Sequence, residues 1–227
     1  MRIEAEHLSR RFGDFLALDD VGFELPSGSR VALVGPNGSG KSTLNRILMG
    51  LLRYEGSVRL DGEPPGGVEL ARRIAYVPQT APSFAVPVGQ LVRAVARMRG
   101  MPAGPVAALA ARLGLDLEPI AGRAFRSLSG GMRQKLLLAL ALAPGVALLI
   151  LDEPTGSLDR ESRERFLPLL DERTAGSTVL FCSHRVDDVS GRVDRVLELV
   201  DGRVGYAGAA SGFPSRRTPG EGVRVSA

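Results

Sequence analysis

Short apolar runs alternate with polar and turn-forming residues in the first third of the chain, a pattern that is typical of β-strands. The pattern predicts strands at residues 3–8, 21–25, 30–35, 57–60 and 72–77. The third of these, RVALVG, is apolar through its centre, and the turn-forming segment DGEPPGG separates the last two. This part of the chain therefore has the character of a β-subdomain.

A helical pattern rich in Ala, Leu and Arg replaces the strands over about residues 88–142. Glycine and proline residues at 100–104 interrupt this pattern. Two mainly apolar runs follow, at residues 147–152 and 177–182, and such runs are typical of buried parallel strands. Strands thus come first, a helical insert follows, and parallel core strands come last.

This order of elements predicts an α/β fold with an N-terminal antiparallel β-subdomain and an inserted helical subdomain at about residues 80–142. A hairpin around Asp201 and Gly202 is expected to close the domain, which then covers residues 1–207. Residues 208–227 are rich in Gly, Pro and Ser, and we expect them to form a flexible tail.

The composition fits a chain with one sizeable domain, since 44% of the 227 residues are hydrophobic and 24% are charged. The net charge of +4 comes mostly from scattered Arg residues, which indicates a solvated surface. No segment approaches the roughly 18 consecutive apolar residues of a membrane span, so we expect a cytosolic chain. Cys182 is the one cysteine, and its place in an apolar run favours a buried structural thiol.

A glycine-rich segment follows the strand at 30–35 and opens a predicted helix. Residues 35–42, GPNGSGKS, fit the pattern G-x-x-x-x-G-K-[ST]. The glycines let backbone N–H groups curl around phosphate oxygens, and the helix directs the positive end of its dipole at the same anion. Lys41 would bind the β- and γ-phosphates as a compact charge, and the Ser42 hydroxyl would bind Mg²⁺. The candidate residues of this P-loop are Gly35, Pro36, Asn37, Gly38, Ser39, Gly40, Lys41, Ser42 and Thr43.

The strand predicted at 147–152 ends in two adjacent carboxylates, those of Asp152 and Glu153. A core strand with ordinary solvated ends is the alternative, but the carboxyl ends of such strands are where α/β sheets bind their ligands. Neighbouring residues of an extended strand point in opposite directions, so the two side chains can take different roles. Asp152 would hold Mg²⁺, directly or through water, and Glu153 would polarise the water that attacks the γ-phosphate.

Residues 128–134, LSGGMRQ, lie just upstream of this strand and resemble the signature motif of ATP-binding cassette (ABC) proteins. Taken alone, the segment predicts a capped helix, with Ser129 as the N-cap and the bare N–H groups of Gly130 and Gly131 behind it. The resemblance implies that this second anion site takes the γ-phosphate of an ATP bound to a partner cassette. Met132 departs from the Gln that many family members have at this position.

Four further residues match positions of the family's motifs. Gln79 matches the Q-loop, which implies that it senses Mg²⁺ and the attacking water and contacts the membrane partner. Asp159 matches the D-loop at the dimer interface, and His184 matches the switch histidine that touches the γ-phosphate. Phe12 stands where the family usually has a Tyr stacked on adenine, although Phe15 nearby leaves that placement open.

The resemblance covers about residues 1–207 and implies the ATP-binding and ATP-hydrolysing subunit of an ABC transporter, with ATP and Mg²⁺ as cofactors. Closure of two cassettes around nucleotide would drive transport by separate transmembrane permease subunits, with the chain in the cytoplasm, peripheral on the inner face of the cell membrane. No half-site looks degenerate, so a homodimer is expected. The form GMRQ at 131–134 is similar to that of bacterial exporters, including the ABC-2-type and copper-site-maturation cassettes.

Two other functions are less compatible with the sequence. A soluble ABC-type ATPase that acts on nucleic acid or ribosomes usually has two cassettes in one chain or a large coiled-coil insert. This chain has neither, so no nucleic-acid partner is expected. A P-loop kinase or GTPase would not have the signature and D-loop motifs, and the base-reading N-K-x-D of GTPases is missing.

Overall fold

The N-terminal strands form a three-stranded antiparallel sheet in the order β2-β1-β4. The computed structural model describes residues 1–182 and 191–213. Inward-facing residues of β1 and β2 are apolar and buried, which is the alternation expected of a sheet with one solvated face. The strands are β1 (Ile3–Phe12), β2 (Phe15–Leu25) and β4 (Glu55–Leu60).

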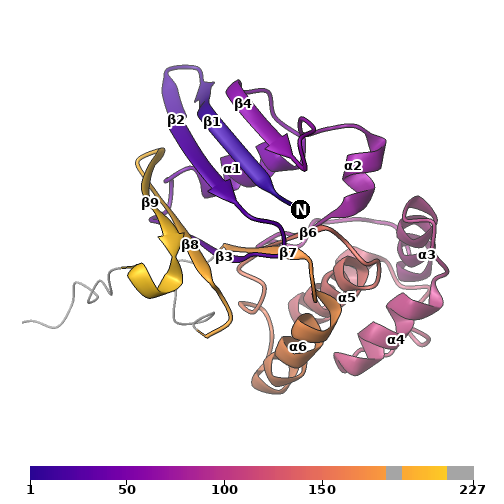
Figure 1. The fold of residues 1–227 in the computed structure, drawn as a ribbon. Helices are drawn as coiled ribbons and strands as arrows, with labels where there is room; N and C mark the ends of the chain where they lie inside the picture. Colours follow the sequence, from indigo (N-terminus) through magenta and orange to yellow (C-terminus); the bar gives the residue numbers. More distant parts are fainter. Residues whose placement is uncertain (183–190, 214–227) are drawn as a thin grey trace, which may run out of the picture.

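A second sheet of six strands has the order β5-β6-β7-β3-β8-β9, and its first five strands are parallel (Figure 1). The central strands are buried almost throughout, as their continuous apolar runs predict. Only β9 runs antiparallel, because a tight turn returns it along β8. The strands are β3 (Arg30–Val34), β5 (Ile74–Val77), β6 (Leu148–Asp152), β7 (Thr178–Cys182), β8 (Arg195–Val200) and β9 (Arg203–Ala209).

Helix α1 (Lys41–Leu48) packs between the two sheets. Its buried Leu44, Ile47 and Leu48 belong to the same apolar cluster as residues of β1, β2, β3 and β7. The helix begins immediately after the P-loop, so the packing of α1 fixes where that loop lies. The antiparallel subdomain thus stabilises the helix whose first turn faces the predicted phosphate site.

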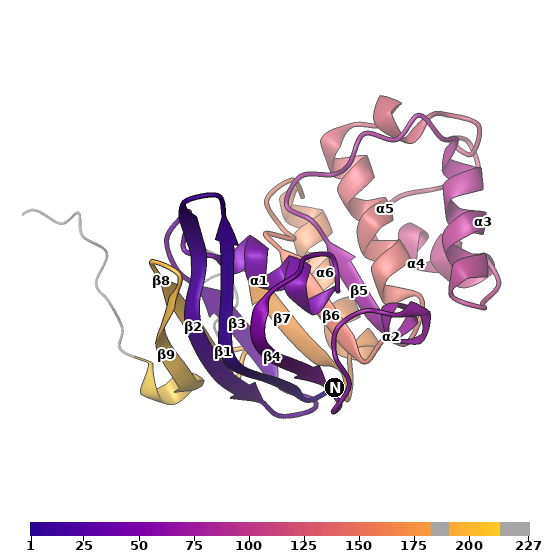
Figure 2. The same ribbon diagram turned by 90° about the horizontal axis from the view of Figure 1, so that it is seen from above.

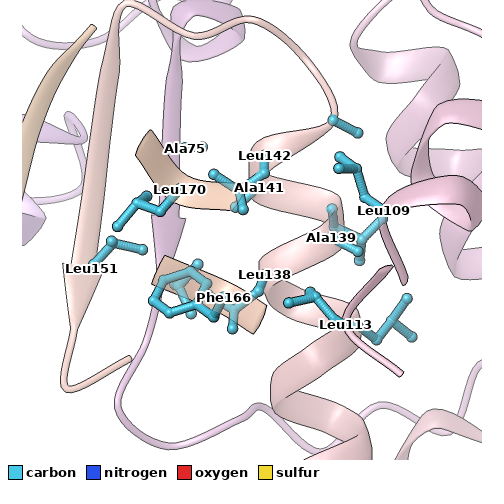
Figure 3. Close-up of a cluster of buried hydrophobic side chains, with 14 of the residues drawn as sticks. Ala75, Leu109, Leu113, Leu138, Ala139, Ala141, Leu142, Leu151, Phe166 and Leu170 are labelled. Atoms are coloured by element: carbon cyan, nitrogen blue, oxygen red, sulfur yellow. The ribbon is translucent and has the colours of Figure 1, made fainter. Parts of the chain in front are cut away.

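The helical subdomain projects to one side of the parallel sheet (Figure 2). Helix α5 lies at its centre: Leu138 and Ala141 contact the α6 and β6 side, while Ala139 lies beside Leu109 of α4 (Figure 3). One continuous apolar cluster therefore joins the subdomain to the core. The helices of the subdomain are α3 (Val88–Met98), α4 (Gly104–Arg112) and α5 (Gly130–Leu142). Helix α6 (Arg160–Arg173) follows β6 and belongs to the core.

The segment predicted as a strand at 72–77 is divided in the structure. Residues 72 and 73 belong to a short helix, α2 (Val68–Arg73), and β5 begins only at Ile74. Arg72 pairs with Glu69 three residues earlier, a spacing that places both side chains on one helical face. The strands at 3–8 and 21–25 are correct in type but too short, because the hairpin continues to a turn at residues 13–14.

The predicted closing hairpin is present, with β8 and β9 paired on either side of Asp201 and Gly202. The folded chain continues beyond residue 207, where the domain was expected to end. Strand β9 extends to Ala209, a 3₁₀ turn covers Ala210–Gly212, and the ring of Phe213 packs edge-on against Tyr206 at 5.3 Å. Residues 214–227 lie outside the described part of the chain.

Among the residues that the structure describes, no helix combines the length and the hydropathy that crossing a bilayer requires.

Candidate functional site

A polar cavity of about 200 Å³ lies at the carboxyl end of the parallel sheet. The loops that follow β3, β5 and β6 meet there, because parallel strands end at the same edge. The cavity thus brings together most of the P-loop, the Q-loop glutamine and both carboxylates that the sequence predicted. The lining residues are Phe15, Ala17, Asn37, Gly38, Gly40, Lys41, Ser42, Thr43, Gln79, Asp152 and Glu153.

At two glycines of the P-loop, the surrounding atoms leave no space for a side chain. A Cβ on Gly35 would lie 2.0 Å from the Leu199 carbonyl oxygen, and one on Gly40 would lie 2.6 Å from that of Ala17. Both glycines also have positive φ angles, of 143° and 102°. The sequence pattern therefore describes a steric requirement of this loop, and the loop is a cradle that a phosphate group fits.

Lys41 lies inside this cradle. Its Nζ donates hydrogen bonds to the carbonyl oxygens of Gly35 at 2.7 Å and Pro36 at 2.9 Å. Partial burial lowers the pKa of its ammonium group, whereas the nearby Asp152 carboxylate acts in the opposite direction. The Ser39 hydroxyl is buried and has no hydrogen-bond partner among the described residues. The loop therefore offers both a cation and an unused polar group.

The three residues predicted to bind magnesium all line the cavity, and each carries a side-chain oxygen: Ser42, Gln79 and Asp152. A hydroxyl, an amide oxygen and one carboxylate suit Mg²⁺, which prefers oxygen ligands and shares its sites with substrate phosphates. Burial raises the pKa of Asp152, while a hydrogen bond from the Tyr76 hydroxyl to Oδ2, at 3.3 Å, lowers it. No cluster of three or more His, Cys, Asp or Glu side chains suited to a metal exists among the described residues, and a magnesium site of this kind does not require one.

Glu153 follows Asp152 in a left-handed backbone conformation, with φ of 48°. This conformation is uncommon outside glycine, and residues held in it are often functional. Its N–H donates to the Cys182 carbonyl oxygen at 3.0 Å, which ties the residue to the neighbouring strand β7. Glu153 thus lies beyond the strand, and the strand alternation assumed from the sequence does not apply to it; both carboxylate residues line the same cavity.

Of the two candidate stacking residues, Phe15 lines the cavity and the predicted Phe12 does not. The two rings are on directly paired residues at the end of the β1–β2 hairpin, but only Phe15 lines the cavity. The guanidinium of Arg10 lies 4.5 Å from the centre of the Phe12 ring and covers it. Phe15 is 61% exposed, so one face of its ring is available for a base.

The signature residues Ser129, Gly130 and Gly131 do not line this cavity. As predicted, Ser129 is the N-cap of α5: its Oγ accepts a hydrogen bond from the Met132 N–H at 3.2 Å. Ser129 and Gly130 are exposed. Their N–H groups therefore form a separate surface site, which is compatible with a nucleotide held by another chain.

Asp159 is also outside the cavity, where it caps helix α6. Its Oδ1 accepts a hydrogen bond from the Ser162 N–H at 2.8 Å, and this bonding lowers the pKa of the carboxyl group. Lys135 of α5 lies 3.7 Å from Oδ2. The switch-histidine assignment, His184, lies outside the described residues.

Two polar residues near the carboxylates were not singled out from the sequence. Tyr76 bonds to Asp152, as described above, and the buried Gln134 donates to the Pro154 carbonyl oxygen. The signal available was their place within the motifs, three residues before Gln79 and at the end of LSGGMRQ. Cys182 is buried as predicted, and this burial raises the pKa of its thiol.

Comparison with known proteins agrees with this geometry. Residues 18–156 match the family described as ABC transporter. The iron(III) import ATP-binding protein FbpC of Streptomyces coelicolor is 39% identical over 216 residues, which cover 91% of this chain and 61% of that protein. The Nod factor export ATP-binding protein I of Burkholderia orbicola is 36% identical over 213 residues, covering 88% and 68%.

A solved structure of an ATP-binding subunit of an ABC transporter has a TM-score of 0.82 and 27% identity, and the match covers 93% of this chain and 91% of that one. The chain spans less than two thirds of the length of the iron transporter protein. The relatives include importers and exporters, so their names do not decide a direction of transport. The family match nevertheless covers more than half of the sequence and includes the P-loop and both carboxylates, and the chain therefore belongs to the ABC transporter family, among its ATP-binding proteins.

Proposed function

We propose that this chain is the ATP-hydrolysing subunit of an ABC transporter and supplies the energy for transport through separate transmembrane permeases. The observation that carries the proposal is the cavity in which the P-loop, Gln79, Asp152 and Glu153 converge. A cation, an anion cradle, magnesium-type ligands and a carboxylate together are the parts that phosphoryl transfer to water requires.

Binding begins with an exchange of partners at Lys41. Its ammonium group donates hydrogen bonds to the Gly35 and Pro36 carbonyl oxygens. The β- and γ-phosphates of ATP would attract this cation more strongly than neutral carbonyls do, because the interaction is between opposite charges. The backbone N–H groups of residues 38–43 and the dipole of α1 would hold the remaining phosphate oxygens.

Ser42, Asp152 and Gln79 would hold Mg²⁺, which supplies positive charge to the phosphate oxygens when it is bound. Tyr76 keeps the Asp152 carboxylate in one orientation. Glu153 would accept a hydrogen bond from the attacking water and orient it in line with the γ-phosphate. Phe15 would stack on the adenine ring at the open side of the cavity.

A second copy of the chain would complete each site. Ser129, Gly130 and Gly131 are exposed or partly exposed at the start of α5, where a γ-phosphate on another chain can reach their N–H groups. Asp159 would lie at the same interface and His184 would touch the γ-phosphate, as the family resemblance implies. The γ-phosphate then bridges two chains, so ATP favours the closed dimer and hydrolysis reopens it.

We infer a cytoplasmic location on the inner face of the cell membrane, with Gln79 near the permease contact. The sequence form of the signature motif favours an exporter of the ABC-2 or copper-site-maturation type. Reconstitution of the chain with its permease in vesicles would test the direction, by measuring whether ATP on the cassette side moves substrate away from that side.

The test of the ATPase assignment is Lys41→Ala. Removal of a phosphate-facing charge should abolish ATP turnover and weaken ATP binding by at least about tenfold, since a charged hydrogen bond contributes about 1.5–3 kcal/mol. Arg112→Ala is the matched control, because it removes a positive charge on α4 that does not line the cavity and is paired with Glu172 at the surface. Wild-type turnover in Lys41→Ala would contradict the assignment. Stable binding of the wild type to ribosomes at physiological salt would instead favour a soluble ATPase.

A further inference from the structure

Gln134 is a buried polar residue on an otherwise apolar face of α5. Gln134 is only 2% exposed, and the other buried residues of this helix are Leu or Ala. A buried amide is costly unless it is hydrogen-bonded. Gln134 meets this requirement, because Nε2 donates to the Pro154 carbonyl oxygen at 3.0 Å.

The partner of this bond is the residue directly after Glu153. The backbone of Glu153 has the left-handed φ of 48°, a strained conformation that needs support from its surroundings. On the N-terminal side, the Glu153 N–H is bonded to the Cys182 carbonyl oxygen at 3.0 Å. The Glu153 carbonyl oxygen accepts from the Gly156 N–H at 3.2 Å, and Gln134 fixes the next carbonyl along the chain.

We propose that Gln134 is a positioning residue for Glu153: it holds the Pro154 peptide and so keeps the Glu153 carboxylate directed at the nucleotide. This inference rests on the proposed role of Glu153 as the group that orients the attacking water. Without the amide, the turn loses the hydrogen bond that holds the carbonyl group next to the strained residue. The carboxylate then samples orientations in which it does not face the γ-phosphate.

The same helix connects this turn to the surface site. Helix α5 is capped by Ser129, five residues before Gln134 and thus about 7.5 Å away along the axis. A phosphate bound at the capped end would contact the first turn of this helix. The second turn of the same helix holds the loop after Glu153 through Gln134. The helix that begins at the signature motif is therefore bonded, through Gln134, to the residue that follows Glu153.

Two variants test the role of the amide. Gln134→Leu and Gln134→Met both remove the hydrogen-bond donor and put an apolar side chain of similar size in its place. If one variant fails to fold, the other serves for the test. We expect kcat for ATP hydrolysis to fall at least about tenfold, because displacement of a catalytic group by about 1 Å can cost on the order of 10²-fold. The equilibrium Kd for ATP should stay within about twofold, since Gln134 is not in the cavity. Leu138→Val is the control, because it alters packing one turn further along α5.

A double mutant separates positioning from general damage. If Gln134 acts through Glu153, the Gln134→Leu change should not lower the residual rate of Glu153→Gln any further. Hydrogen–deuterium exchange of a peptide covering residues 150–158 should be faster in nucleotide-free Gln134→Leu than in wild type and Leu138→Val. Equal losses of rate in both backgrounds, or an unchanged kcat in the single variants, would overturn the inference. Full activity of Glu153→Gln would instead overturn the proposed function, whatever Gln134 does.

Discussion

The hydroxyl of Tyr76 on β5 donates a hydrogen bond to Oδ2 of Asp152 at the end of β6, over 3.3 Å. The two strands are neighbours in the parallel sheet, so the bond connects the carboxyl ends of two strands at the edge of the cavity. It engages one oxygen of the carboxylate of a predicted magnesium ligand. A hydrogen bond of this kind helps to orient a metal-binding side chain.

Loss of this bond should weaken the response to Mg²⁺. Tyr76→Phe removes only the hydroxyl, and a hydrogen bond of this kind contributes about 0.5–1.5 kcal/mol. We expect the Mg²⁺ concentration for half-maximal ATP hydrolysis to rise by about two- to tenfold, with ATP binding in the absence of metal unchanged. A titration of activity and of ATP binding with MgCl₂ measures both quantities. An unchanged Mg²⁺ requirement would show that the bond does not orient Asp152.

The base-stacking assignment is testable because the chain contains no Trp. Phe15→Trp introduces a single indole at the cavity, whereas Phe12→Trp places one on the paired residue that does not line it. We expect ATP to change the fluorescence of Phe15→Trp strongly and that of Phe12→Trp little. Phe15→Ala should weaken ATP binding by about 1–3 kcal/mol, the range for stacking of a base on an aromatic ring. The opposite pattern would restore the assignment to Phe12.

The proposed dimer should be trapped by removal of the Glu153 carboxylate, which is proposed to orient the attacking water. Glu153→Gln preserves the shape of the side chain, so ATP should bind and persist. We expect this variant to be dimeric with ATP and Mg²⁺ and monomeric with ADP, by light scattering after size-exclusion chromatography. Addition of Ser129→Arg should abolish the dimer, because it fills the exposed signature site with a bulky side chain. A monomer at saturating ATP would mean that the chain pairs with a different cassette or requires its permease.

Arg99 joins the helical subdomain to the core and should matter for stability. Its guanidinium, at the end of α3, donates hydrogen bonds to the carbonyl oxygens of Ala71, Arg72 and Ile74, the last at 2.5 Å. Bonds from a charged donor contribute about 1.5–3 kcal/mol each, with losses that are not additive. We expect Arg99→Ala to lower the free energy of unfolding by about 2–4 kcal/mol in urea titrations. Arg97→Ala, on the exposed side of the same helix, should change it by less than about 0.5 kcal/mol.

The sequence predicted the parts of the site whose chemistry requires particular residues at a fixed spacing. No side chain fits at Gly35 or Gly40, so the glycines of the P-loop pattern follow directly from the geometry of the loop. The apolar run before Asp152 likewise determines a buried strand, and a strand of a parallel sheet must end at the edge where ligands bind. The α/β fold, the inserted helices and the closing hairpin followed from the same kind of pattern.

The remainder depends on tertiary contacts that a linear pattern does not contain. Phe12 and Phe15 are equivalent by sequence, and the structure distinguishes them: Phe15 lines the cavity, whereas the Arg10 guanidinium lies over the Phe12 ring. The boundary between α2 and β5 is another example, since the carbonyl groups of α2 are bonded to Arg99, which lies 25 residues beyond Ile74. Gln134 is part of the signature motif in the sequence. Its partner is the Pro154 carbonyl, a backbone group, so no residue type in the sequence indicates the bond.

The buried thiol of Cys182 has a practical consequence for observing the moving protein. It is the one cysteine of the chain. It is buried at the end of β7, where the Asn45 amide donates a hydrogen bond to its sulfur at 3.0 Å. Burial raises the pKa of the thiol, so it is protonated at neutral pH. Since the thiolate is the reactive form, a maleimide label should ignore it. A cysteine placed at the exposed Met98 of the helical subdomain would then accept a spin label at one defined position. The wild-type sequence can thus serve, without removal of its cysteine, for distance spectroscopy of the proposed opening and closing of the dimer.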